Sequence, residues 1–268
     1  MALIQANLYS RSLKRIVTVH VILPVDKYTR EGRFVREDKP FKTLYLLHGL
    51  SGNYTDWVSG TRIQRWAEEK NLAVIMPSGD NAYYLDQIAP GRNYGEFVGS
   101  ELVEVTRRMF PLSNDREDTF IGGLSMGGFG AIRNGLKYHE TFGYVAGLSS
   151  SLRLFDLDMP TNKELSLLLE SYFGDFREAA LTDKHPKVIV EALKKRIDSG
   201  ECVRFPKIFM ACGTEDNLLE TNRICKDFFL ENGLSVSYHE GPGGHDWDFW
   251  DESIRKVLDW LPLEGATE

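Results

Sequence analysis

Short apolar segments that end in glycine, serine or proline recur along the sequence and alternate with helix-like segments. The apolar segments cover residues 15–23, 43–47, 72–76, 118–121, 144–148, 207–212 and 236–240, and the helix-like ones cover residues 62–71, 99–110, 129–138, 220–232 and 251–261. A short run that is apolar on both faces is typical of a strand in a sheet that is covered on both sides. The alternation therefore predicts an α/β fold with a mostly parallel central sheet and helices on both faces.

Two regions depart from this alternation. Residues 26–40 are polar and charged, and we expect them to form an exposed hairpin connection, with the two N-terminal strands as an antiparallel edge of the sheet. Residues 152–205 separate two predicted strands by a stretch longer than an ordinary crossover. We interpret this stretch as a cap-like helical insertion near the active site, over the carboxyl ends of the strands, within a single domain of residues 1–268.

The sequence Gly123-Leu124-Ser125-Met126-Gly127 follows a predicted strand and precedes a helix-like segment. A G-x-S-x-G pattern between a strand and a helix is typical of a nucleophile elbow, a sharp turn that holds the serine hydroxyl exposed. Glycines flank the serine because a Cβ atom at either position would clash in so tight a turn. Ser125 is therefore the candidate nucleophile, and the backbone N–H of Met126 is a candidate donor to the oxyanion.

A serine hydroxyl needs a base that removes its proton during attack, and this base is expected near the end of the chain, because α/β-hydrolases order their triad as serine, acid and histidine. The chain has six histidines, at positions 20, 48, 139, 185, 239 and 245. Only His239 and His245 closely follow the last strands. His239 lies inside a predicted strand, whereas His245 lies in a glycine-rich loop beyond it, where such sheets build their sites. We therefore predict His245 as the base.

The acid that orients this histidine should lie on the loop after the preceding strand. That loop contains Glu215 and Asp216, and their chemistry alone does not choose between them. Asp246 and Asp248 lie beside the histidine in the sequence, but hydrogen bonding within their own loop explains them better.

A second oxyanion donor is expected from the loop after the first buried parallel strand, His48-Gly49-Leu50-Ser51-Gly52. The donor is a backbone N–H, so the side chain is only weakly constrained, and we select Leu50. We expect His48 to be structural and to hold this loop in shape.

Aromatic residues are abundant near the predicted cleft, at Tyr54, Trp57, Tyr83, Tyr84, Tyr94, Trp247 and Trp250. Ordinary packing explains most of them, although flat rings also stack on aromatic acyl groups and sugars. We select Trp57 and Trp247 as candidate substrate contacts. The polar loop 86–94 adds Gln87 as a third candidate, with Arg92 as an alternative.

Composition and charge disfavour several classes of binding partner. The formal net charge of −7 disfavours a nucleic-acid partner, since phosphate affinity comes mainly from clustered basic residues. No apolar run approaches the ~20 residues of a membrane span, and the N-terminus lacks a signal-peptide pattern, so we expect a cytoplasmic protein with no membrane partner. Cys202, Cys212 and Cys225 contain no C-x-x-C pair and are expected to be reduced thiols, with no metal site.

Four stretches together resemble the esterase D family of α/β-hydrolases, and most closely its bacterial tributyrin esterases: YLLHGLSGNYTDW, FIGGLSMGGFGAI, ACGTEDNLL and GGHDWDFW. The resemblance runs from about Lys14 to Leu261 and is weakest in residues 152–205. It implies a small-molecule ester substrate with a short acyl chain, no cofactor, and a homo-oligomer. It also implies Asp216 as the acid, with Leu50 and Met126 as the oxyanion donors.

The same family includes S-formylglutathione hydrolases, mycolyltransferases, and carbohydrate-esterase feruloyl and acetylxylan esterases. S-Formylglutathione hydrolases typically carry a cysteine in the oxyanion loop, where this chain has Ser51-Gly52-Asn53. We therefore favour a serine carboxylesterase for acetyl and butyryl esters, with a feruloyl or acetyl-xylooligosaccharide esterase or an S-formylglutathione thioesterase as alternatives. An acyltransferase that uses the same acyl-enzyme and a catalytically silent scaffold are the other classes to be tested.

Overall fold

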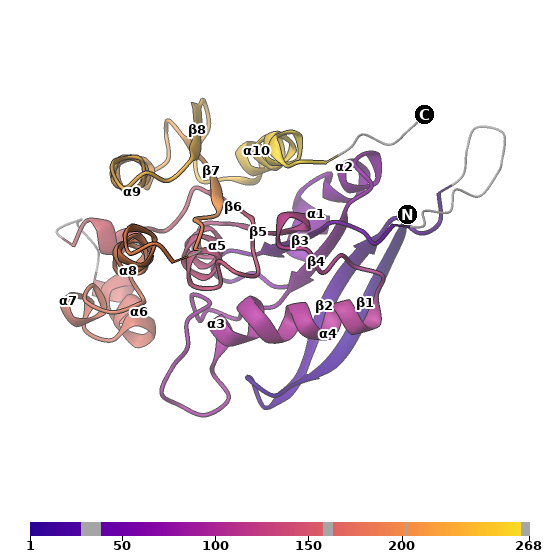
Figure 1. Ribbon diagram of the computed structural model, residues 1–268, viewed down its shortest axis with the longest axis horizontal. Coiled ribbons are helices and arrows are strands. Elements are labelled where there is room, and N and C mark those ends of the chain that lie inside the picture. The colour runs from indigo at the N-terminus through magenta and orange to yellow at the C-terminus, as the bar shows by residue number, and fades with distance from the viewer. Residues whose placement is uncertain (28–38, 158–162, 202, 264–268) are drawn as a thin grey trace.

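One eight-stranded sheet forms the centre of the protein (Figure 1). The computed structural model describes residues 1–27, 39–157, 163–201 and 203–263. The strands are β1 (Ala2–Ser10), β2 (Arg15–Leu23), β3 (Thr43–Leu47), β4 (Ala73–Pro77), β5 (Thr119–Leu124), β6 (Tyr144–Leu148), β7 (Lys207–Gly213) and β8 (Val236–Gly241). Their order across the sheet is β1-β2-β4-β3-β5-β6-β7-β8, and all pairs from β4 to β8 are parallel. The predicted α/β-hydrolase arrangement of a mostly parallel sheet is confirmed.

The buried strands are apolar throughout because each supplies two cores. Successive side chains of a strand point to opposite faces of the sheet. In β3, Tyr45 and Leu47 join the core on one face, and Leu44 and Leu46 join the core on the other. The strands therefore lack the apolar–polar alternation of a sheet with one wet face.

Helices cover both faces. They are α1 (Asp56–Gly60), α2 (Ile63–Glu69), α3 (Tyr94–Glu96), α4 (Leu102–Met109), α5 (Met126–Lys137), α6 (Lys163–Phe173), α7 (Phe176–Ala179), α8 (Pro186–Asp198), α9 (Leu219–Glu231) and α10 (Trp247–Trp260). In Figure 1, α2 and α10 lie on one side of the sheet, and α4, α5, α8 and α9 lie on the other. Among the described residues, no helix is both long enough and apolar enough to cross a membrane.

The N-terminal edge differs from the expected one. An antiparallel edge is present, but it consists of β1 and β2, joined by a tight turn, and β1 was not foreseen. The predicted hairpin between residues 15–23 and 43–47 is wrong, because β2 pairs with β4 and β3 lies between β4 and β5. Of its predicted connection, residues 28–38 lie outside the described part of the chain. Alanine and asparagine have low strand propensity, so the sequence pattern does not predict β1.

Two helices begin earlier than expected, at Met126 rather than Phe129 and at Trp247 rather than Asp251. The predicted helix 99–110 also begins earlier, with α3 and a five-residue π-helix, Phe97–Glu101, that leads into α4. The π-helix carries Glu101, whose buried carboxylate accepts hydrogen bonds from the turn between β1 and β2. This ties the antiparallel edge to the helical layer.

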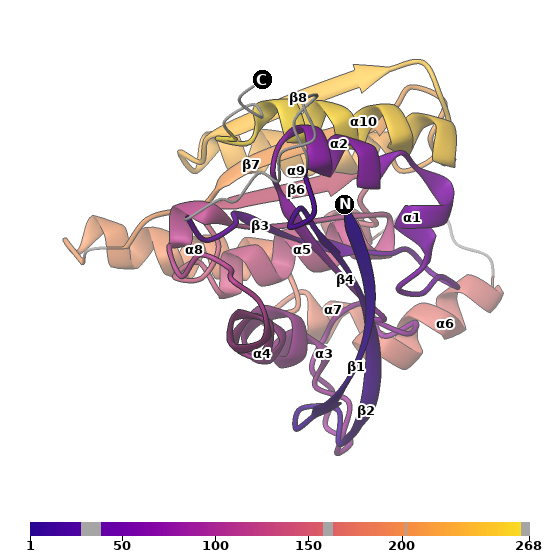
Figure 2. The same cartoon turned by 90° about the vertical axis from the view of Figure 1, so that its right-hand side faces the viewer.

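The insertion between β6 and β7 divides into two parts. Helix α8 lies beside α5 on one face of the sheet. Helices α6 and α1 lie instead at the end of the sheet to which the arrow of β8 points (Figure 2). Arg133, almost fully buried on α5, binds both the carbonyl and the carboxylate of Asp183 and so fastens the loop between α7 and α8. Of the α-helices in the described part of the insertion, α6 thus lies on the side of the carboxyl edge of the sheet.

Candidate active site

Ser125 lies at the turn between β5 and α5. Its φ of 53° and ψ of −118° fall in a region that costs a residue with a side chain about 1–3 kcal/mol. A Cβ atom on Gly123 would lie 2.4 Å from the carbonyl oxygen of Gly127, and one on Gly127 would lie 2.4 Å from that of Leu47. Backbone contacts therefore require both glycines of the motif, and the turn presents Ser125 at the carboxyl end of β5.

Three predicted residues form a chain of hydrogen bonds. Ser125 Oγ lies 2.9 Å from His245 Nε2, and His245 Nδ1 lies 2.8 Å from Asp216 Oδ2. Because an ionised carboxylate only accepts, Nδ1 carries the proton and Nε2 is free to accept from the serine hydroxyl. The loops after β5, β7 and β8 bring these residues to one edge of the sheet.

The carboxylate of Asp216 is fully buried and is held from two sides. Oδ1 accepts the N–H of Leu218 at 2.9 Å, and Oδ2 accepts the N–H of His245. Burial raises the pKa of Asp216, but the hydrogen bonds from His245 and Leu218 outweigh burial, and the pKa lies below its ordinary value. The group is therefore ionised at neutral pH and can stabilise an imidazolium.

The other carboxylates near the histidine have separate partners. Glu215 Oε2 accepts the N–H of Gly243 at 3.0 Å, so it braces the histidine loop from outside. Asp246 is the N-cap of α10 and accepts the N–H of Phe249 at 3.0 Å. The geometry thus distinguishes Asp216, which binds His245, from Glu215, which does not. The residue types alone leave this choice open.

Two further histidines have structural positions. His239 lies on β8 and stacks on Phe209, with 4.9 Å between ring centroids. His48 is buried, donates from Nδ1 to the carbonyl of Gly49 and accepts at Nε2 the N–H of Gly79 at 2.8 Å. Burial lowers the pKa of His48, which keeps the ring neutral and able to make both bonds.

The loop after β3 passes directly beside Ser125. A Cβ atom on Gly49 would lie 3.5 Å from that of Ser125. Among the described residues, no acceptor faces the N–H of Leu50. Met126 is the first residue of α5, so its N–H has no acceptor within the helix and lies at the positive end of the helix dipole. One free N–H group therefore follows Ser125 directly in the chain, and another lies in the loop that passes beside it.

A residue that the sequence analysis missed holds this loop. Asn81 Oδ1 accepts the N–H of Ser51 at 2.7 Å, and Ser51 has a positive φ of 63°. In the same segment, the hydroxyl of Tyr84 donates to the carbonyl of His48. Asn81 follows the carboxyl end of β4, and its place at that edge of the sheet was the available signal.

The candidate substrate-binding tryptophans differ in exposure. Trp57 is 1% exposed, and its indole N–H donates to the carbonyl of Leu47 at 3.0 Å, which corresponds to a packing role in the core. Trp247 is half-buried and packs edge-on against both Trp57 and Trp250. Because Trp250 in turn packs edge-on against His245 at 4.9 Å, Trp247 belongs to the rim of the site.

Gln87 lies elsewhere. Its side chain accepts a hydrogen bond from Arg92, and it lines a surface hollow of about 480 Å³ beside the turn between β1 and β2. No member of the hydrogen-bond chain lines this hollow. The structure therefore does not bring Gln87 together with Ser125.

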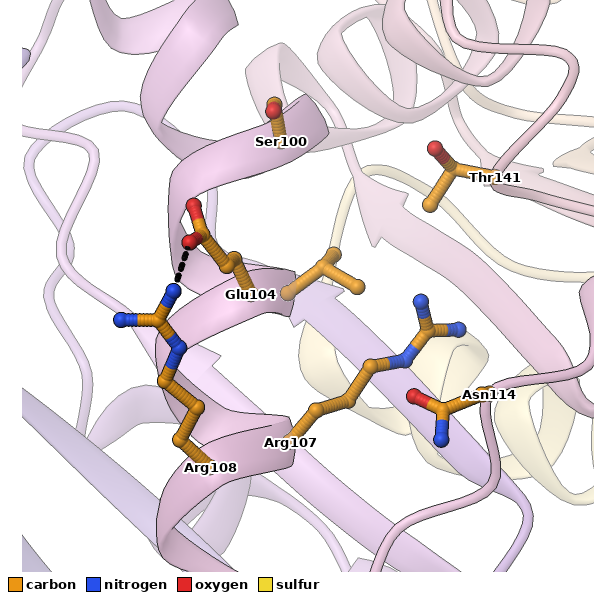
Figure 3. A pocket seen from close by; sticks show the side chains of 7 residues that line it. Ser100, Glu104, Arg107, Arg108, Asn114 and Thr141 are labelled. Carbon is orange, nitrogen blue, oxygen red and sulfur yellow. Dashed lines mark hydrogen bonds and ion pairs between the residues drawn. The ribbon is translucent and has the colours of Figure 1, made fainter.

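Another surface hollow, of about 450 Å³, lies beside α4 (Figure 3). Its arginines already have partners: Arg107 donates to the carbonyl of Ser113 and the hydroxyl of Thr119, and Arg108 is paired with Glu104. This hollow also lacks any residue of the hydrogen-bond chain.

Two cysteines, Cys212 and Cys225, are buried free thiols, while Cys202 lies outside the described residues. Burial and the charge of Asp216 raise the pKa of Cys212 to about 12, so this thiol stays protonated. In the described part of the chain, no group of three or more histidine, cysteine, aspartate or glutamate side chains is arranged to hold a metal ion.

Comparison with known proteins assigns the chain to a family. Residues 10–261 match the family model described as "Putative esterase". The acetyl esterase of Caldicellulosiruptor saccharolyticus is 43% identical over 266 residues, which cover 97% of this chain and 98% of that protein.

Solved structures give the same result. The S-formylglutathione hydrolase FrmB from Staphylococcus aureus is 31% identical, with a TM-score of 0.81 and coverage of 97% of this chain and 98% of that one. A ferulic acid esterase, 22% identical over 97% of each chain, shares the fold with a TM-score of 0.74. The chain therefore belongs to this esterase family and is a carboxylic ester hydrolase of the α/β-hydrolase fold.

Proposed function

We propose that this protein hydrolyses short-chain acyl esters, acetyl and butyryl esters such as tributyrin, with Ser125, His245 and Asp216 as its catalytic triad. The observation that carries the proposal is the unbroken hydrogen-bond chain from Ser125 Oγ through His245 to Asp216. The likeness to an acetyl esterase over nearly the whole of both chains supports the short acyl group.

The geometry suits acyl transfer in two steps. Ser125 Oγ attacks the acyl carbonyl while His245 Nε2 takes its proton, and Asp216 stabilises the imidazolium that forms. The histidine then donates this proton to the departing alcohol, which leaves an acyl group on Ser125. In the second step His245 removes a proton from water, the hydroxide attacks the acyl-enzyme, and the carboxylic acid leaves as Ser125 regains its proton.

The negative charge on the carbonyl oxygen needs donors that are already in place. We propose the backbone N–H groups of Leu50 and Met126, because Met126 follows Ser125 directly, Leu50 lies in the loop beside it, and no acceptor among the described residues faces either N–H. A donor of this kind contributes roughly 3–4 kcal/mol to transition-state stabilisation. We also propose that Trp247 forms part of the rim that the substrate passes.

The test is a matched panel of esters, each assayed with the wild type and with Ser125→Ala. The panel contains p-nitrophenyl acetate, butyrate and octanoate, tributyrin, methyl ferulate, acetylated xylo-oligosaccharide and S-formylglutathione. We expect kcat/KM to be highest for acetate or butyrate and to vanish into background in Ser125→Ala. If octanoate or ferulate is the best substrate, the short-acyl proposal is refuted, and if Ser125→Ala retains activity, the triad is refuted.

S-Formylglutathione hydrolysis is the second candidate, and its support is the likeness to the hydrolase from Staphylococcus aureus. Both reactions pass through an acyl-enzyme on Ser125, but here the acyl group is formyl rather than acetyl or butyryl, and the leaving group is a thiol rather than an alcohol. A kcat/KM for the thioester at least tenfold above that for the acetate ester would favour this candidate. Amino alcohols or thiols that accept the acyl group faster than water would instead indicate an acyltransferase.

A further inference from the structure

Strand β1 is an open edge of the sheet. It pairs with β2 along its whole length, and within the described residues no strand pairs with its other side. Figure 2 looks onto this edge, where β1 crosses in front of the sheet. An edge strand presents a row of backbone N–H and C=O groups that can pair with another strand.

This edge lacks the features that normally prevent pairing. Proteins protect edge strands with charged side chains, prolines or bulges. All nine residues of β1 are uncharged, none is proline, and its register with β2 is unbroken. The opposite edge, β8, carries Glu240, which forms an ion pair with Arg223. One edge of the sheet is therefore guarded by charge and the other is open.

Apolar side chains are exposed at the open edge. Leu3 is 42% exposed and Tyr9 is 62% exposed, and Ile16, directly opposite Tyr9 on β2, is 69% exposed. On the other face of β1, Ile4 and Ala6 are only half-buried although they pack against the core. Both faces of the strand would gain apolar cover from a further strand alongside it.

The sequence of β1 is complementary to itself. When β1 runs antiparallel to a copy of itself about Ala6, each side chain meets one of its own kind: Ala2 meets Ser10, Leu3 meets Tyr9, Ile4 meets Leu8, and Gln5 meets Asn7. Directly opposed side chains are the unit of stabilisation in an antiparallel pair. Small, apolar and amide side chains are thus matched on both faces.

We propose that β1 is the docking surface for β1 of a second copy of this chain, antiparallel about a two-fold axis at Ala6. The sheet then continues from one protomer into the other. A two-fold contact uses the same surface of both copies, so it closes on itself and leaves no β1 edge for a third copy. Glu240 on β8 is a charged edge residue of the kind that disfavours pairing at the other side of the sheet.

The test places charges at the two amide positions. One variant carries Gln5→Lys and Asn7→Lys, and the other carries Gln5→Glu and Asn7→Glu. These side chains are exposed in a single chain, but across the axis they face their own kind, so each variant alone repels itself. His239→Lys, at an exposed position of β8, is the matched control.

Sedimentation velocity measures the outcome, and ester hydrolysis checks that each variant is folded. We expect the wild type and the control to have twice the 30.5 kDa mass of one chain, and each charge variant alone to fall to half of that mass. Mixing the lysine and glutamate variants should restore the doubled mass as a one-to-one heterodimer. Amide hydrogen exchange within residues 2–10 should be slower in the wild type and in the mixture than in either variant alone.

Three results would overturn the proposal. The first is a wild type that sediments as a single chain, and the second is a lysine variant that keeps the doubled mass. The third is a mixture of the two charge variants that remains at the mass of one chain.

Discussion

Replacement of Asp216 by asparagine tests the site most directly, because it changes one atom of a fully buried side chain. The amide has one acceptor oxygen and one NH₂ group that only donates, while the two oxygens of the carboxylate accept from Leu218 and His245. If the amide oxygen stays on the N–H of Leu218, its NH₂ group faces His245 Nδ1. The ring then has to accept at Nδ1 and carry its proton on Nε2, and it can no longer take the proton of Ser125.

The expected loss follows from this change of tautomer. The same substitution in a serine protease triad lowers kcat by about 10⁴ with the geometry intact, which corresponds to about 5.5 kcal/mol of transition-state stabilisation. We expect Asp216→Asn to lose roughly 10³–10⁴ in kcat for p-nitrophenyl acetate, with KM little changed. The assay is steady-state release of p-nitrophenol, together with thermal unfolding to check the fold.

Glu215→Gln is the matched control. Glu215 is the adjacent carboxylate, but it binds the backbone of the histidine loop from outside. We expect its kcat to stay within about threefold of the wild type, since the amide oxygen of glutamine can still accept the N–H of Gly243 and the lost charge is exposed. A folded Asp216→Asn enzyme within tenfold of the wild type would refute the reasoning. An equal loss in Glu215→Gln would refute it as well.

Asn81→Ala should lower kcat about tenfold at an unchanged KM in the same assay, because the N–H of Ser51 loses the acceptor that holds the oxyanion loop; an unchanged kcat would exclude this role. Burial, reinforced by the charge of Lys187, lowers the pKa of His185 to about 4, so the unfolded chain takes up its proton first as pH falls below about 6.5. The urea midpoint of the wild type should therefore be lower at pH 5 than at pH 7.5. The difference should be smaller in His185→Asn, which keeps an N-cap acceptor for α8. An equal pH dependence of the midpoint in the wild type and the variant would contradict this. Gly127→Ala would put a methyl carbon 2.4 Å from a backbone oxygen of β3, so we expect an inactive protein with a lower melting temperature, and wild-type activity would argue against the elbow geometry.

The parallel strands could be predicted from the sequence because they are buried on both faces. Each then reads as an uninterrupted apolar run that ends in glycine, serine or proline, which is a strong local signal. Strand β1 carries no such signal, since its outward side chains include Gln5 and Asn7. Its place is set by pairing with β2, a tertiary contact that a local pattern does not reveal.

The candidate triad could be predicted from the sequence for a related reason. Ser125 and His245 lie in glycine-rich turns directly after strands, and the order of strands brings such turns to one edge. The choice between Glu215 and Asp216 depends instead on which side chain of one turn points inward. That direction follows from the N–H of Leu218, which fixes the inner carboxylate.

Trp57 and Gln87 show where proximity in the sequence misleads. Trp57 follows the oxyanion loop by a few residues, but a turn of α1 carries its indole into the core, onto the carbonyl of Leu47. Gln87 follows β4 at the correct edge of the sheet, but its loop then leads away to the β1–β2 turn. Neither change of direction is visible in residue types alone.

The backbone at Ser125 has an evolutionary consequence. Its positive φ and negative ψ suit glycine better than any residue with a side chain, so Ser125, the proposed nucleophile, is held in a conformation that weakens the fold by about 1–3 kcal/mol. A copy of this gene released from selection for hydrolysis would gain stability by exchanging the serine for glycine. Selection for activity therefore opposes selection for stability at this single codon, and a descendant with glycine there would be a robust but silent member of the fold.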